Sequence, residues 1–96
     1  MRVTVCELPH EPRALEAAWE RLCRHPARQR SELVLLPEFA FVEPVWEGET
    51  FDRERWDAAE ALSDGWLARL FELGVGHVIG TRPRTIAGRS LNQGYH

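Results

Sequence analysis

The sequence contains no lysine, only two cysteines and no long hydrophobic run. All 12 basic residues are arginine, and 15 acidic residues outnumber them, which gives a formal net charge of −3. This balance argues against nucleic acid as a partner, because no basic patch is large enough to neutralise several phosphates. No apolar run approaches the roughly 20 residues that span a bilayer. Glu7 and His10 interrupt the apolar stretch near the N-terminus, so neither a membrane partner nor a secretory signal is expected.

Cysteine and histidine are too few, and too widely spaced, to predict a disulfide framework or a metal site. Cys6 and Cys23 do not make the disulfide framework of an exported mini-protein, and we expect both to be small core residues of a reduced, cytoplasmic protein. The four histidines lack the spacing of metal ligands, so no metal site is predicted. The glycines around Gly76 do not open a helix, so they do not predict a nucleotide-binding loop. We expect no cofactor.

The residues that are present predict one small globular domain of 96 residues, 44% hydrophobic and 28% charged. Alternating apolar residues predict a first strand over residues 2–8. Apolar residues at helical spacing predict an amphipathic helix from about Pro12 to about Pro26. The four-residue apolar run Leu33–Leu36, closed by Pro37, is typical of a central strand that is buried on both faces.

The second half of the chain continues the alternation of segment types. A long connection is expected over residues 39–51, followed by a second helix over residues 52–73. A third strand over residues 76–80, a hairpin connection over residues 82–90 and a fourth strand over residues 91–96 complete the expected elements. The order strand-helix-strand-helix-strand-strand predicts an α/β fold with parallel pairing between the strands that flank each helix.

One carboxylate stands out by its position. Ligands of open α/β sheets bind beyond the carboxyl ends of the strands, and Glu38 directly follows the predicted buried strand. His10 leaves the first strand at the same edge. With Phe39 and Phe41 beside it, the Glu38 carboxylate is expected to be partly desolvated and able to act as a base. The alternative is that Glu38 has no functional role and is only a solvent-exposed charged residue at the end of a strand.

The long connection holds one further candidate. Trp46 is a possible substrate-contacting residue, and anchoring of the loop is the alternative. Glu43, Glu47 and Glu49 are interpreted as a solvated acidic stretch rather than as ligands.

The string Ser-Glu-Leu-Val-Leu-Leu-Pro-Glu-Phe at residues 31–39, taken with its surroundings, resembles the nitrilase or carbon–nitrogen hydrolase superfamily. The matching pieces are Val3–Val5, the helix around Trp19, Pro37–Glu38, Val78–Thr81 and Asn92. Their order and spacing hold over nearly the whole chain. The resemblance implies that residues 1–96 are the N-terminal part of an incomplete hydrolase domain, with a partial α-β-β-α sandwich.

The resemblance also implies a Glu-Lys-Cys mechanism for cleaving non-peptide C–N bonds of small amides or nitriles. Cysteine attacks the substrate carbon, glutamate is the general base and lysine stabilises the developing charge. Glu38 is the one position that maps onto this triad. The chain has no lysine and ends before the region of the family's lysine and cysteine, while Cys6 and Cys23 lie on the wrong elements. We therefore expect this chain to be inactive alone and the complete protein to be a homo-oligomer.

Two other interpretations stay open. The chain can be a non-catalytic α/β module that binds a small molecule or a partner at the same edge of the sheet, or a truncated product without an independent role. If it is part of a face-to-face sandwich, the strands around Val3 and Leu33 carry uncovered aliphatic side chains, and the isolated chain is expected to self-associate.

Overall fold

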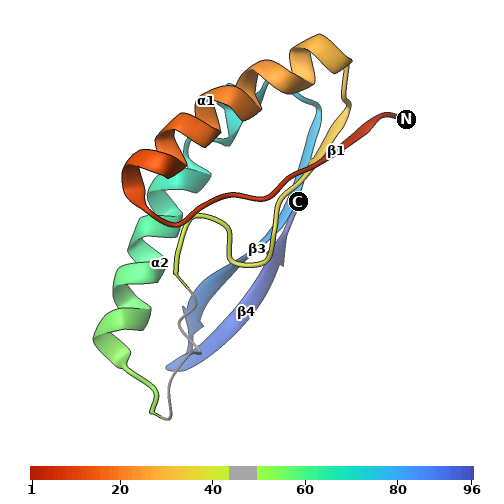
Figure 1. Ribbon diagram of the computed structural model, residues 1–96. Coiled ribbons are helices and arrows are strands. Elements are labelled where there is room, and N and C mark those ends of the chain that lie inside the picture. Colours follow the sequence, from red (N-terminus) through yellow and green to blue (C-terminus); the bar gives the residue numbers. More distant parts are fainter. Residues whose placement is uncertain (44–49) are drawn as a thin grey trace.

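The computed structural model describes residues 1–43 and 50–96, which form a four-stranded sheet with both α-helices on one side of it (Figure 1). The elements are β1 (Val3–Val5), α1 (Pro12–Gln29), β2 (Leu33–Leu35), α2 (Arg53–Leu67), the 3-10 helix η1 (Leu70–Leu73), β3 (His77–Ile86) and β4 (Arg89–Tyr95). The predicted α/β class and the order of the elements are confirmed. No helix of the described part is long and apolar enough to cross a membrane.

The sheet follows the chain order, β1-β2-β3-β4. The strands β1, β2 and β3 are parallel, and β4 pairs antiparallel with β3. Each parallel pair is joined through a helix, as expected for a strand-helix-strand crossover. The apolar run at Leu33–Leu36 therefore provides the predicted internal strand, with β1 on one side and β3 on the other.

Only one face of the parallel strands is covered. On β2, Val34 is 0% exposed and points toward the helices, whereas the next residue, Leu35, is 38% exposed. The prediction that this strand is buried on both faces is therefore wrong for the described chain, because α1 and α2 lie on the same side of the sheet (Figure 1). The sheet and its helices supply two layers.

The helix α1 is longer than predicted. Its N-cap is Glu11, whose carboxylate accepts hydrogen bonds from the backbone N–H groups of Arg13 and Ala14 at 3.1 and 2.8 Å. The helix continues past Pro26 to Gln29, so the predicted end near Pro26 is wrong. A proline removes one backbone donor, and here the loss falls near the end of the helix, where Pro26 itself is buried.

The segment predicted as a hairpin connection, residues 82–90, is mostly strand. The strands β3 and β4 pair over seven residues on each side, from Gly80–Tyr95 to Ile86–Arg89. The turn is reduced to Ala87 and Gly88, both at positive φ (51° and 76°), which suits a two-residue hairpin turn. Pro83 is tolerated inside β3 because β2 pairs only with the first three residues of that strand.

The predicted second helix is interrupted. The helix α2 ends at Leu67, and η1 completes the segment up to Gly74, which adopts the expected left-handed cap conformation with φ 64°. The N-cap is Asp52, whose carboxylate accepts a hydrogen bond from the backbone N–H of Arg55 at 3.2 Å. Leu62, within the predicted helix, is 50% exposed.

Three aromatic rings form the centre of the main core. Trp19 of α1 makes edge-on contacts with Phe41 and with Trp66 of α2, with ring centroids 5.7 and 5.3 Å apart. Phe41 stacks on Trp66 at 5.1 Å. Phe41 has φ 83°, a conformation that an aromatic residue adopts only where packing determines it. The loop that follows β2 is thus fixed against both helices.

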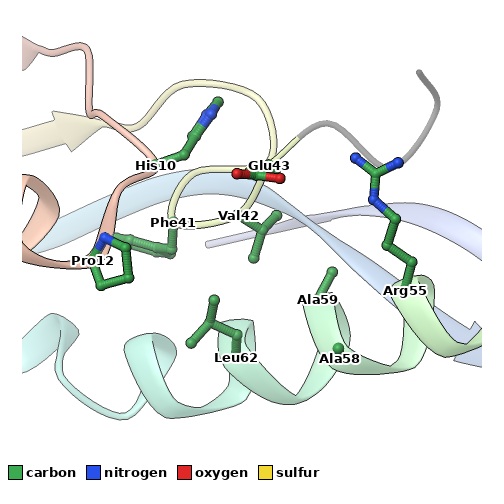
Figure 2. A pocket seen from close by; sticks show the side chains of 9 residues that line it. All are labelled: His10, Pro12, Phe41, Val42, Glu43, Arg55, Ala58, Ala59 and Leu62. Atoms are coloured by element: carbon green, nitrogen blue, oxygen red, sulfur yellow. The ribbon is translucent and has the colours of Figure 1, made fainter. Parts of the chain in front are cut away.

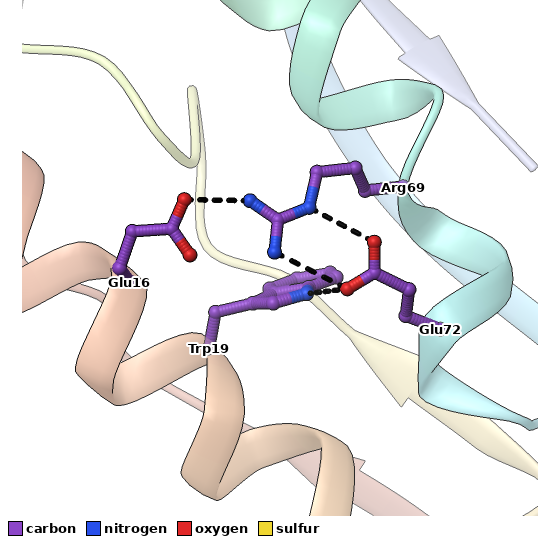
Figure 3. Close-up of polar contacts among 4 residues, drawn as sticks. All are labelled: Glu16, Trp19, Arg69 and Glu72. Carbon is purple, nitrogen blue, oxygen red and sulfur yellow. Dashed lines mark hydrogen bonds and ion pairs between the residues drawn. The ribbon is translucent and has the colours of Figure 1, made fainter.

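A polar cluster ties α1 to the segment after α2 (Figure 3). The Arg69 guanidinium donates to the Glu16 carboxylate at 2.7 Å and to Glu72 at 2.9 Å. The Trp19 indole N–H donates to the same Glu72 carboxylate at 3.1 Å. The guanidinium also lies 4.4 Å from the centre of the Trp66 ring. These contacts orient the central tryptophans.

We expect Glu72→Gln to lower the Tm at pH 7 and this difference to disappear in acid. The Arg69 guanidinium and the Trp19 N–H bind the carboxylate and hold the pKa of Glu72 below its ordinary value of 4.5. A lowered pKa stabilises the fold above pH 4.5, and the contribution is lost as the pH falls through the lowered pKa. Thermal melts between pH 7 and pH 3 measure the difference. Glu7→Gln, at an exposed position, is the control; a difference that persists unchanged at pH 3 would contradict the assignment.

Candidate functional site

Glu38 lies where β2 ends and the chain leaves the sheet. Its side chain is exposed, and its carboxylate accepts a hydrogen bond from the Asn92 side-chain amide of β4 at 3.1 Å. The two residues are separated by 54 positions in the sequence. The carboxylate is therefore held toward the β3–β4 ribbon.

A second contact fixes the backbone next to Glu38. The backbone N–H of Phe39 donates to the Thr81 hydroxyl at 3.0 Å, and Phe39 has φ 45°. The segments Pro37–Glu38, Gly80–Thr81 and Asn92 are three of the pieces that carry the family resemblance. They come from β2, β3 and β4 and meet at one place.

The expected desolvation of Glu38 is wrong for the described chain. The carboxylate is exposed, while the two neighbouring rings are buried in different clusters. Phe39 packs on Trp56 of α2, with centroids 6.1 Å apart, and Phe41 belongs to the main core. The apolar residues after Glu38 thus serve the helix side of the fold and leave the carboxylate in contact with water.

A hollow of about 270 Å³ lies between the start of α1, the loop after β2 and α2 (Figure 2). Its lining residues are His10, Pro12, Phe41, Val42, Glu43, Arg55, Ala58, Ala59 and Leu62. The side chains of α2 form one wall and His10 stands on the opposite side (Figure 2). His10 is at the predicted edge, but Glu38 is not among the residues that line this hollow. The sequence pattern did not indicate that residues of α2 line a hollow with His10, because they are distant from His10 in the sequence.

The predicted substrate-contacting residue, Trp46, lies outside the described residues, as do Glu47 and Glu49. Glu43 is described and is exposed, as interpreted from the sequence, although it also lines the hollow.

Neither cysteine has the character of an activated nucleophile. The Cys6 thiol lies 3.9 Å from the Leu35 carbonyl oxygen, and burial raises its pKa above the ordinary value. Burial also raises the pKa of Cys23, on α1. A raised pKa keeps a thiol protonated, and the thiolate is the attacking species. Within residues 1–43 and 50–96, no group of three or more His, Cys, Asp or Glu side chains is arranged to hold a metal ion.

Comparisons with known protein families, curated proteins and solved structures give no match to this chain. The positions and contacts described above are therefore the basis for a proposal about function.

Proposed function

We propose that this chain is the N-terminal part of a nitrilase-like carbon–nitrogen hydrolase and that Glu38 is its general base. The observation that carries the proposal is the hydrogen bond between Glu38 and Asn92. This contact joins two pieces of the family pattern that are distant in the sequence. The Phe39–Thr81 hydrogen bond adds a third piece.

The arrangement suits a base that must be oriented before a substrate arrives. The Asn92 amide occupies one carboxylate oxygen of Glu38 and leaves the other to accept a proton. In the proposed mechanism this oxygen takes the proton of a cysteine thiol, and the thiolate attacks the amide or nitrile carbon. For an amide, the protonated Glu38 gives this proton to the leaving nitrogen, and ammonia leaves. Glu38, a carboxylate again, then deprotonates the water that attacks the thioester, and the departing cysteine thiolate takes that proton back.

The nucleophile and the stabilising cation of this mechanism are not supplied by the chain itself. It contains no lysine, and its two thiols are kept protonated by burial. We therefore expect residues 1–96 to release no ammonia from simple nitriles and amides. Turnover by a clean preparation that disappears in Glu38→Gln would overturn the assignment of the missing groups to residues outside this sequence.

The decisive experiment joins the chain to the reading frame that follows it in the gene. The proposal predicts a continuation that carries a lysine and then a cysteine, and an expressed product that releases ammonia. In that product, Glu38→Gln should lower kcat by about 10²-fold or more, as expected for a lost general base. Glu7→Gln, an exposed carboxylate that does not line the hollow, is the matched control. A continuation without these residues, or an equal loss in both variants, would contradict the proposal.

The hollow beside α2 favours a second candidate function, a non-catalytic module that binds a small molecule. Its floor is apolar, and its rim carries the imidazole of His10 and the carboxylate of Glu43. Small-molecule sites commonly combine an apolar lining with a few polar groups. A ligand screen by nuclear magnetic resonance separates the two functions. Ligands of a binding module should shift the resonances of His10 and Leu62. For the hydrolase, the turnover of substrates should depend on Glu38.

A further inference from the structure

We propose that His77 and His96 form a two-imidazole site for a divalent transition-metal ion, with Cu²⁺ bound most tightly. The Nδ1 atom of His77 lies 3.0 Å from the Nε2 atom of His96, and the two ring centroids are 5.1 Å apart. Both side chains are exposed. The proposal does not rest on the function proposed for Glu38. His77 pairs with Leu33 at the start of β2, whereas Glu38 follows the end of that strand.

The antiparallel strands β3 and β4 bring the two histidines together. The two residues are 19 positions apart in the sequence, so their spacing did not indicate the pair. The last pair of the two strands is Gly80 with Tyr95, and continuing this register puts His96 beside Ile79. His77 is then the diagonal neighbour of His96, a position that long side chains reach across an antiparallel pair.

Contacts of the neighbouring backbone hold both histidines in place. The backbone N–H of His77 donates to the carbonyl oxygen of Glu32 at 3.1 Å. On β4, the Tyr95 hydroxyl group occupies the place that a Cβ atom of Gly80 would need, so the residue before His96 packs directly on β3. Two ligands on paired strands are already close together. Once one imidazole binds an ion, the bond to the second is intramolecular and is favoured by the high effective concentration.

The separation of the two nitrogens suits two ligands of one ion. Metal–nitrogen bonds of about 2.0–2.1 Å, at angles between a right angle and the tetrahedral angle, put two ligand nitrogens about 2.8–3.4 Å apart. The 3.0 Å between the His77 and His96 nitrogens falls in this range. Imidazole binds Zn²⁺, Ni²⁺ and Cu²⁺, and among divalent ions of the first transition row Cu²⁺ forms the most stable complexes.

The ion takes the place of the proton that the two rings share. In the hydrogen bond, one of the facing nitrogens carries a proton and the other accepts it. When both rings are neutral, the donor ring gives this proton to water and receives one at its other nitrogen, so that both facing lone pairs can bind the ion. Among the described residues, no third His, Cys, Asp or Glu side chain joins the pair as a metal ligand. Water therefore completes the coordination, and the site requires no residue from outside the sequence.

Calorimetric titration of the 96-residue chain with CuCl₂ at pH 7.5 tests the proposal. We expect one tightly bound ion per chain, with an affinity that does not depend on protein concentration, because both ligands come from the same chain. The electron paramagnetic resonance spectrum of the bound Cu²⁺ should show hyperfine coupling to two nitrogens. Ni²⁺ and Zn²⁺ should bind at the same place more weakly.

His77→Ala and His96→Ala should each weaken the binding of Cu²⁺ at least tenfold, because only one imidazole remains. His25→Ala is the matched control, since His25 is exposed on α1 and its loss should leave the tight site unchanged. Circular dichroism of each variant checks that the fold is kept. An ion that binds as tightly after either substitution at the pair is held elsewhere, by the amino terminus or by a single histidine, and overturns the proposal. Binding that is no tighter in the wild type than in His77→Ala, that is lost in His25→Ala, or that needs two chains does the same.

Discussion

Trp19→Ala is expected to lower the stability of the chain by about 3–5 kcal/mol, as large aromatic truncations in cores do. Trp19 is 1% exposed and contacts both Phe41 and Trp66. Its removal leaves a cavity between α1 and α2 and takes away the indole N–H that binds Glu72. A small domain has a total stability of about 5–15 kcal/mol, so much of the chain is expected to be unfolded at 37 °C.

Thermal unfolding followed by circular dichroism measures this effect. A loss of about 3 kcal/mol corresponds to a fall in Tm of about 12 °C or more for a domain of this size. Phe71→Ala also removes an aromatic ring, although a smaller one, from a site that is 80% exposed, and its Tm should stay near that of the wild type. Equal shifts in both variants would show that the ring at Trp19 is not at the centre of the core.

The elements of this fold were predictable because hydrophobic burial leaves a short-range pattern. The run Leu33–Leu36 favours an internal strand over a helix, and Leu33–Leu35 form β2 between β1 and β3. The burial of each face of β2 depends on segments that are distant in the sequence. The apolar run alone therefore could not indicate that Leu35 is exposed. The face of Leu35 depends on the position of α1 and α2, which local spacing does not determine.

The errors at helix and strand ends share one cause. The sequence predicts a helix end near Pro26 and a connection over residues 82–90, which include Pro83, because a proline lacks the N–H that a regular element uses. Tertiary context overrides this rule at both positions. Pro26 removes one hydrogen bond to the carbonyl four residues earlier, but it lies in the last turns of α1 and is buried there. Pro83 lies beyond the residues of β3 that pair with β2, so no hydrogen bond to β2 is lost. Neither circumstance can be read from the residues next to the proline.

The candidate site was predictable in part and for a different reason. Glu38 follows from its place after a strand, but its contact with Asn92 was not predicted, because the resemblance names the two residues only as separate pieces of the sequence. Arg69 had no signal at all, although it joins Glu16 on α1 to Glu72. The Arg69 guanidinium binds a carboxylate that is 53 positions away in the sequence. Such a contact is determined by the packing of the helices and not by sequence spacing.

The sharpest test of a sheet with one covered face compares two neighbouring residues of β2. Val34→Asp is expected to abolish folding, because Val34 is 0% exposed and lies in the main core among buried apolar side chains. An unpaired carboxylate in such a place has a desolvation cost of several kcal/mol, or must be protonated. That cost is comparable with the total stability of about 5–15 kcal/mol.

Leu35→Asp places the same charge one residue further along and should leave the chain folded. Leu35 is 38% exposed, so the new carboxylate remains hydrated. Side chains of a strand alternate between the two faces of the sheet, so a one-residue step moves the charge from the core to the uncovered face of the sheet. Far-ultraviolet circular dichroism and proteolysis at matched concentration distinguish the two variants.

If Leu35→Asp unfolds as completely as Val34→Asp, both faces of β2 are buried in solution and the sheet with one covered face is wrong. If both fold, Val34 is not in the core. A folded Leu35→Asp beside an unfolded Val34→Asp supports a sheet with one covered face, because the first substitution leaves the core intact and the second places a charge in it.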